Sequence, residues 1–303
     1  MPDLENLFDL TYKGARSDRH EIDFYDVSQA LVGFQRSLAL TTHLILNGEV
    51  ITQAPSLAGA KFFALPPEEG SWRWTANLVF VGTALYGLTT APRDSVLGNL
   101  VTSAYDYVIS ESLGFHVDFN STLGQQYEEF KRQHPDAPAL TESKMDSLIE
   151  KCEVAVKQLH RPLIESETAD AAVISSNISG HVRDIGGPLS RGTYDYLQYS
   201  VRSEGTVEFV GRISSYNMNT FKGRAYLENS HRPVPFTLAD SARKKIFVRL
   251  ITRSLLLNAE NPADSGASIR LTAYSYTSRT GRLKWLLVDY VETSSELADV
   301  ELE

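Results

Sequence analysis

The chain has 303 residues, more than the ~100–200 of a typical single domain, so its length predicts two domains. Hydrophobic residues make up 42% and charged residues 22%, which excludes a disordered chain, and the single cysteine, Cys152, excludes an internal disulfide and every CxxC motif. The net charge of −9 is unevenly distributed. Residues 1–200 carry 26 acidic and 15 basic side chains, whereas residues 201–290 carry 7 acidic and 14 basic ones. Residues 291–303 carry 5 acidic side chains and no basic one. An acidic body, a basic module and an acidic tail suggest different partners for the different parts.

The start of the chain shows no targeting segment. The first nine residues are acidic and lack a basic stretch followed by an apolar one, so a signal peptide is not expected. The most apolar run, Leu78–Leu88, is far shorter than the ~20 residues of a membrane-spanning helix. We therefore expect a cytoplasmic protein with no membrane partner.

Residues 1–81 predict a strand, a helix and further strands. Asn6–Tyr12 alternates between apolar and polar residues, as a half-buried strand does. A helix is expected to begin at Asp26 or Ser28 and to end at Asn47, just before a glycine. The other extended segments are Val50–Thr52, Lys61–Leu65 and Trp72–Val81.

The middle of the chain is predicted to be helical. Spacing of apolar residues predicts helices over Leu97–Ser112, Tyr127–Gln133 and Thr141–Leu159. Residues 176–200 are rich in Ser, Gly and Tyr, and Gly186-Gly187-Pro188 is the strongest breaker in the chain. We place the domain boundary there, which gives an acidic α+β body with a helical middle over 1–185, a basic β-barrel over 193–292 and an acidic tail over 293–303.

The C-terminal module predicts three strands, one helix and two strands. In order they are Thr206–Ser214, Phe221–Leu227, Val234–Leu238, the helix Ala242–Asn258, Ser268–Thr277 and Arg282–Glu292. Within the helix, Lys245, Arg249 and Arg253 are spaced four residues apart and form one basic stripe.

This β-β-β-α-β-β order resembles the OB-fold, the small Greek-key barrel of many oligonucleotide-binding proteins. The resemblance covers residues 206–292 and rests on the order of the elements alone. It implies an α+β chain with a C-terminal OB-like barrel, and residues 1–200 are not assigned to a family.

The resemblance also implies where a ligand binds. Such barrels use the face around their second and third strands and the loops on either side of it. The cations and polar or aromatic residues at these places are Arg212, Tyr216, Asn217, Lys222, Arg224, Tyr226, Arg279, Arg282 and Lys284. Cations neutralise phosphates and aromatic rings stack on unpaired bases, so this mixture suits single-stranded DNA or RNA, or a phosphorylated ligand. The alternative is that these residues only solvate the open face of a barrel.

The second strand of this barrel gives a sharper expectation. Lys222, Arg224 and Tyr226 alternate with Phe221, Ala225 and Leu227, so the first three are expected to face solvent if the other three fill the core.

No catalytic motif stands out, and no metal or other cofactor is expected, since the chain lacks GxxxxGK[ST], GxGxxG and GxSxG. The favoured hypothesis is a non-enzymatic binding protein. One alternative is an adaptor or sensor subunit of a bacterial multi-protein system, which binds a protein partner or forms a homo-oligomer. A second alternative is a hydrolase with a site between the domains, around His181–Asp184. The pairs His116 with Asp118 and His160 with Glu165 are interpreted as ordinary polar residues.

Overall fold

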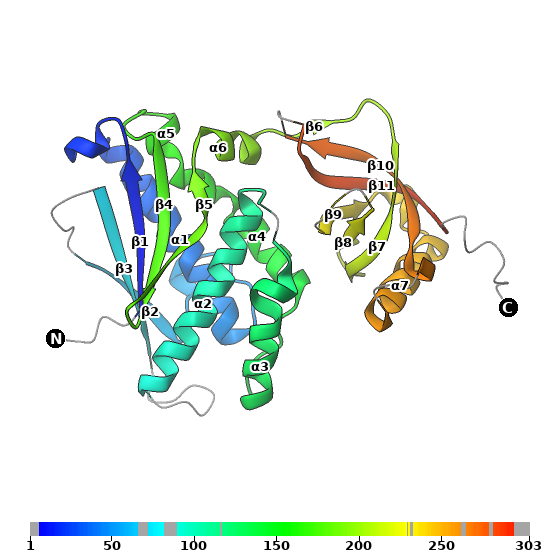
Figure 1. The fold of residues 1–303 in the computed structure, drawn as a ribbon, viewed down its shortest axis with the longest axis horizontal. Helices are drawn as coiled ribbons and strands as arrows, with labels where there is room; N and C mark the ends of the chain where they lie inside the picture. The colour runs from blue at the N-terminus through cyan, green and yellow to red at the C-terminus, as the bar shows by residue number, and fades with distance from the viewer. Residues whose placement is uncertain are drawn as a thin grey trace. The chain divides into compact units, whose positions relative to one another are not determined.

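The computed structural model describes residues 6–65, 72–81, 90–115, 117–228, 230, 233–261, 265–278 and 281–293. The chain divides into two compact units, Met1–Gln198 and Tyr199–Glu303, and each is described here by itself (Figure 1). The division lies after the Gly186-Gly187-Pro188 breaker, which belongs to a strand of the first unit and not to a linker.

The first unit contains a five-stranded antiparallel sheet. Its strands are β1 (Asn6–Lys13), β2 (Ala60–Ala64), β3 (Trp72–Phe80), β4 (Ala171–Ile178) and β5 (His181–Leu189), in the spatial order β2-β3-β1-β4-β5. The central strand β1 pairs with β3 on one side and with β4 on the other, so the sheet joins segments more than 150 residues apart.

One face of this sheet forms the core of the unit. On β1, Phe8, Leu10 and Tyr12 are at most 1% exposed, whereas Leu7 and Asp9 lie on the other face and are partly exposed. This is the period-two alternation that the sequence predicts for a half-buried strand.

Helices lie on the core side of the sheet, with α1 and α2 against the strands and α4 packed on α1 and α2 (Figure 1). They are α1 (Phe24–Asn47), α2 (Thr90–Ser112), a π-helical turn (Asn120–Gly124), α3 (Gln125–Gln133), α4 (Glu142–Leu159), α5 (Arg161–Ile164) and α6 (Arg191–Gln198). The first of these begins earlier than either predicted cap, because the carboxylate of Asp23 accepts the backbone N–H of Asp26 at 2.9 Å. The predicted extended segment Val50–Thr52 forms no strand.

The glycine pair predicted as a linker interrupts β5 instead. Gly186 has φ +64°, a conformation that other residues rarely adopt, and its N–H donates to Asp106 Oδ1 at 2.7 Å. The pairing of β4 with β5 shifts register between Ala172 and Ile174. A sequence breaker thus marks an irregular edge strand.

The second unit is built around a closed five-stranded barrel. Its strands are β7 (Val207–Asn217), β8 (Lys222–Leu227), β9 (Pro233–Leu238), β10 (Ile269–Thr277) and β11 (Leu283–Thr293), with the short β6 (Val201–Arg202) added beside β10. The order β7-β8-β9-β11-β10 returns to β7, and the pair β9–β11 is parallel while the others are antiparallel.

A single helix, α7 (Lys245–Glu260), lies between β9 and β10 in the chain and packs on the barrel through Phe247, Ile251 and Ser254. It confirms the predicted helix with bounds two or three residues later. The fold is therefore the predicted α+β chain with a C-terminal OB-like barrel. No helix in the described part of the chain is both long and apolar enough to span a bilayer.

Candidate nucleic-acid interface

Strand β8 confirms the predicted alternation but not the predicted exposure. Ala225 and Leu227 are buried in the barrel core, and Lys222, Arg224 and Tyr226 lie on the outer side. Arg224, however, is only 2% exposed. It lies on a central strand, between neighbours on β7 and β9, so the expectation that it faces solvent is wrong.

Tyr216 also lies elsewhere than predicted. A bulge between Ile213 and Ser215 reverses the alternation at the end of β7. The ring of Tyr216 consequently stacks on Phe236 of the core, with centroids 6.2 Å apart, and burial raises the pKa of its hydroxyl. The next residue, Asn217, closes the β7–β8 turn through its Oδ1, which accepts two backbone N–H groups. Both residues have a structural role here.

Two predicted residues line a hollow on the barrel surface. Arg212 and Tyr226 are cross-strand neighbours on β7 and β8. They border a cavity of about 240 Å³, which is lined by Gly211, Arg212, Tyr226, Leu227, Glu228, Ser230 and Ser268. Arg212 forms no ion pair with any residue that the structure describes. Its guanidinium is thus available to an anionic ligand.

The predicted loop between the last two strands is only partly described. Arg279 lies outside the described residues, and Arg282 is exposed. The ammonium of Lys284 donates to the backbone oxygen of Tyr199 at 3.0 Å, so it holds the start of this unit against the hairpin.

The same hairpin carries an aromatic cluster that the sequence reasoning missed. Tyr276 and Trp285 are cross-strand neighbours, and their rings stack with centroids 3.8 Å apart and planes 11° apart. Tyr274 lies two residues before Tyr276 and on the same face of β10. The guanidinium carbon of Arg202 lies 3.7 Å from the centroid of the Tyr274 ring. We call these four residues the outer aromatic face, since they alternate with the buried Ala273 and Leu286.

The outer aromatic face is connected to the predicted cations through the strand register. Lys222 pairs with Thr237, Thr237 with Leu287, and Leu287 with Tyr274. These residues form one continuous row on the outside of the barrel, which runs over β8, β9, β11 and β10. The Tyr-Ser-Tyr pattern of β10 was visible in the sequence, but only the register shows that Trp285 and Arg202 join it.

A second basic surface lies on α7. Lys245, Arg249 and Arg253 are exposed, as the predicted stripe requires, and none pairs with an acidic side chain in the described residues. Ile246 and Leu256 beside them are 59% and 58% exposed. This stripe offers charge and aliphatic surface, and the exposed ring beside α7 is that of Tyr290, which packs on Phe247.

The residues considered for catalysis do not converge. His181 and Asp184 are on β5, where an odd separation places them on opposite faces of the strand. His160 is fully buried, and its Nε2 lies 2.9 Å from Thr193 Oγ1, with no carboxylate as partner. His116 lies outside the described residues. Within the described part of the chain, no three metal-binding side chains come together.

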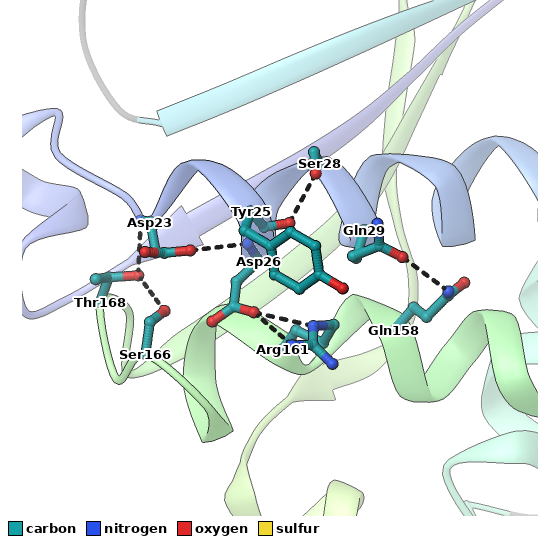
Figure 2. A network of polar contacts seen from close by, with 9 residues as sticks. All are labelled: Asp23, Tyr25, Asp26, Ser28, Gln29, Gln158, Arg161, Ser166 and Thr168. Atoms are coloured by element: carbon teal, nitrogen blue, oxygen red, sulfur yellow. Dashed lines mark hydrogen bonds and ion pairs between the residues drawn. The ribbon is translucent and has the colours of Figure 1, made fainter.

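The main polar network of the first unit holds α1 against α5 (Figure 2). Asp26, buried at the start of α1, accepts from Arg161 Nε at 2.9 Å and Nη2 at 2.8 Å. The guanidinium of Arg161 also lies 5.2 Å from the ring of Tyr25. Every charged group drawn has a partner within the network, which therefore fits a structural role and not a ligand site.

Two family models match the chain. The model described as Domain of unknown function (DUF7946) matches residues 8–196, and the model described as Family of unknown function (DUF7947) matches residues 205–290. The two matches lie on either side of the division after Gln198. No curated protein and no solved structure matches the chain.

Proposed function

We propose that this chain, which belongs to the family described as Domain of unknown function (DUF7946), is a binding protein whose C-terminal barrel contacts single-stranded nucleic acid. The observation that supports the proposal is the outer aromatic face, where three aromatic rings and one exposed guanidinium lie together on the outside of a small barrel.

The chemistry of single strands matches this face. Bases without a partner strand expose both ring faces, and stacking on aromatic side chains stabilises each by ~1–3 kcal/mol. Tyr276 and Trp285 already form a parallel stack, which a base extends without reorganising either ring. Arg202, positioned over Tyr274, supplies a cation for the phosphate and a planar group for a base.

The cations nearby extend the same binding site. Lys222 belongs to the continuous outer row, and Arg212 lies on β7, the other neighbour of β8. Their contacts with phosphate give affinity without reading sequence, because every nucleotide carries the same phosphate. Binding is therefore expected to be weakly sequence-specific and to weaken as salt increases.

The adaptor hypothesis has a separate observation in its favour. The α7 stripe combines exposed cations with the exposed Ile246 and Leu256, a mixture that suits an acidic, partly apolar protein surface. Its own residues include no ring stack like that of Tyr276 and Trp285, so it ranks second as a nucleic-acid site.

The proposal is tested by fluorescence anisotropy of a labelled oligothymidylate across a salt series. Arg202→Gln is expected to weaken binding and to reduce the salt slope by about 1, while Tyr276→Leu weakens binding with the slope unchanged. Arg253→Gln removes the same charge from α7 and serves as the control.

Two outcomes contradict the proposal. Absence of binding by the unmodified chain at low salt removes nucleic acid as the ligand. An equal loss of affinity in Arg202→Gln and Arg253→Gln shows that charge alone, and not the outer aromatic face, attracts the oligonucleotide. Thermal melting of each variant separates lost binding from lost folding.

A further inference from the structure

The exposed face of α7 carries a row of positive charges without described counter-ions. The α7 stripe, Lys245, Arg249 and Arg253, is preceded by the exposed Lys244. None of the four forms an ion pair with a residue that the structure describes. Like charges four residues apart on a helix repel each other, so the stripe destabilises its own helix until an anion covers it.

The helix is also charged against its own dipole. The N-terminus of a helix carries a partial positive charge, and acidic side chains in the first turn usually balance it. The first turn of α7 has no acidic residue, and Lys244 at its N-cap position forms no side-chain cap. The one acidic residue of the helix, Glu260, is its last. An anionic segment on the first half of α7 therefore stabilises both the cations and the helix.

The same face is partly apolar. Ile246 is 59% exposed and Leu256 58%. At about 100° per residue, these two and the α7 stripe fall within a sector about 100° wide, so they form one surface. A nucleic-acid backbone neutralises the cations of such a surface but leaves the aliphatic side chains in water. An acidic peptide with apolar residues covers both.

The acidic tail of this chain has this chemistry. Residues 294–303 contain four acidic side chains and no basic one, which matches the four cations in number. Apolar side chains lie between the acidic ones. The acidic residues are Glu296, Asp299, Glu301 and Glu303, and the larger apolar ones are Leu297, Val300 and Leu302.

The tail also begins beside α7. Strand β11 ends at Thr293, which pairs with Ile269, two residues after the Ala267 carbonyl that accepts from Ser254 of the helix. Ten residues reach at most ~33 Å, more than the ~24 Å length of α7. Trp285 of the outer aromatic face lies eight residues back along β11, at ~26 Å, so α7 is the nearer of the two surfaces.

We propose that residues 294–303 bind the α7 stripe of the same chain, with the carboxylates on its cations and the apolar side chains on Ile246 and Leu256. The tether gives the tail a local concentration on the order of mM, at which weak surface ion pairs suffice for binding. An occupied stripe is closed to other polyanions, so a nucleic acid is directed to the outer aromatic face. This last consequence rests on the proposed function, whereas the contact of tail and helix does not.

Carbodiimide cross-linking of the full chain tests the contact. The reagent joins a carboxylate to a lysine amine where the two touch, and the linked peptides are identified by mass spectrometry. We expect links from the tail to Lys244 or Lys245. Fragmentation of the linked peptides distinguishes the tail from Asp289, which accepts from Ser241 in the structure. An equal mixture of unlabelled and ¹⁵N-labelled chains shows whether the link lies within one chain.

Variants of α7 test the role of its arginines. Arg249→Gln with Arg253→Gln leaves every cross-linking group in place and removes two ion pairs, each a factor of about 2 in binding, so the yield of the link falls up to about fourfold. Arg212→Gln with Arg282→Gln removes the same charge from elsewhere on the barrel and is the matched control. Its yield is expected to stay unchanged.

Three results overturn the proposal. One is a tail that links chiefly to Lys222, Lys284 or lysines of the first unit. The second is a link that forms only between labelled and unlabelled copies. The third is an equal fall in yield in the two double variants, because general charge and not the α7 stripe then attracts the tail.

Anisotropy with a labelled oligothymidylate tests the consequence for nucleic acid. Replacing the four tail acids by their amides is expected to tighten binding and to steepen its salt dependence, because α7 becomes available. Adding Arg249→Gln and Arg253→Gln to this variant is expected to abolish the gain. A gain that persists contradicts the blocking role of the tail. If no variant binds the oligonucleotide while the cross-link forms, the proposed function fails and the tail contact stands.

Discussion

The hydroxyl of Ser254 accepts the backbone N–H of Ile213 at 3.0 Å and donates to the carbonyl of Ala267 at 2.6 Å. Ser254 lies on α7, whereas Ile213 immediately precedes the bulge of β7. The side-chain amide of Asn258, one turn further along the helix, donates to the carbonyl of Ile213 at 3.1 Å. The helix therefore satisfies the peptide groups of the barrel strand where the bulge disturbs its pairing.

Removal of the Ser254 hydroxyl is predicted to destabilise the barrel. Ser254→Ala leaves the N–H of Ile213 buried without an acceptor, which costs about 1–3 kcal/mol. Thr252→Ala is the control, because among the described residues that hydroxyl bonds only to carbonyls of its own helix. Urea unfolding of both variants measures the difference in the free energy of unfolding. Equal values for the two variants would show that the hydrogen bonds of Ser254 do not stabilise the packing of α7 on the barrel.

The ion pair between Asp26 and Arg161 is predicted to matter far more than an exposed one. Arg161→Ala leaves the carboxylate of Asp26, whose side chain is 6% exposed, without its cation, and we expect a loss of about 2–3 kcal/mol. Arg191 and Glu167 form a pair of similar length in which both side chains are over 60% exposed, so Arg191→Ala is expected to cost less than ~1 kcal/mol. Chemical denaturation that ranks the two variants the other way contradicts this account.

The buried His160 predicts how stability depends on pH. Its Nδ1–H donates to the carbonyl of Val156, its Nε2 lies 2.9 Å from Thr193 Oγ1, and burial lowers the pKa of the ring to about 4. The unfolded chain, with a histidine pKa near ~6.5, binds more protons between these values. The contribution of His160 to the free energy of unfolding is therefore fully present above about pH 6.5. It is lost as the pH falls toward 4, by up to about 3 kcal/mol.

This pH dependence is measured by denaturation at a series of pH values. His160→Gln removes this titrating group and is expected to reduce the slope of the profile between pH 4 and 6.5, while His43, whose pKa is also lowered by burial, still contributes to it. If the free energy of unfolding of His160→Gln depends on pH as steeply as that of the unmodified chain, the pH dependence comes from other groups.

Arg224 gives a prediction that reverses the one made from sequence. Because this residue is 2% exposed, Arg224→Ala is expected to cost on the order of 1–3 kcal/mol of barrel stability. Lys222→Ala, two residues away and partly exposed, is expected to change stability by less than ~0.5 kcal/mol. Thermal unfolding of both variants is the measurement, and a stable Arg224→Ala variant would show that its burial is unimportant.

Local patterns predicted most of the barrel because each of its strands alternates on its own. The spacing in Phe221–Leu227 correctly placed Ala225 and Leu227 in the core, and the order of the elements predicted the barrel itself. The first unit was harder. Its strand β4 and its interrupted partner β5 lie far along the chain from β1, and a Gly-Gly-Pro sequence is as typical of a linker as of an irregular strand.

The interface could be predicted only in part, because a binding surface depends on neighbours from other strands. Arg224 is buried between β7 and β9, and a single bulge turns Tyr216 into the core. Neither effect has a signal in the local sequence. The outer aromatic face was missed for the same reason, since Tyr276 and Trp285 become neighbours only through the register of a hairpin.

Photochemical cross-linking tests the central claim most directly, because it reports where a nucleic acid lies on the chain. A photoreactive oligothymidylate is bound to the full chain at low salt, irradiated and digested, and the modified peptides are identified by mass spectrometry. The account predicts cross-links at Tyr274, Tyr276 or Trp285, and a loss of these cross-links in Tyr276→Leu. Cross-links confined to α7 or to the first unit would contradict it.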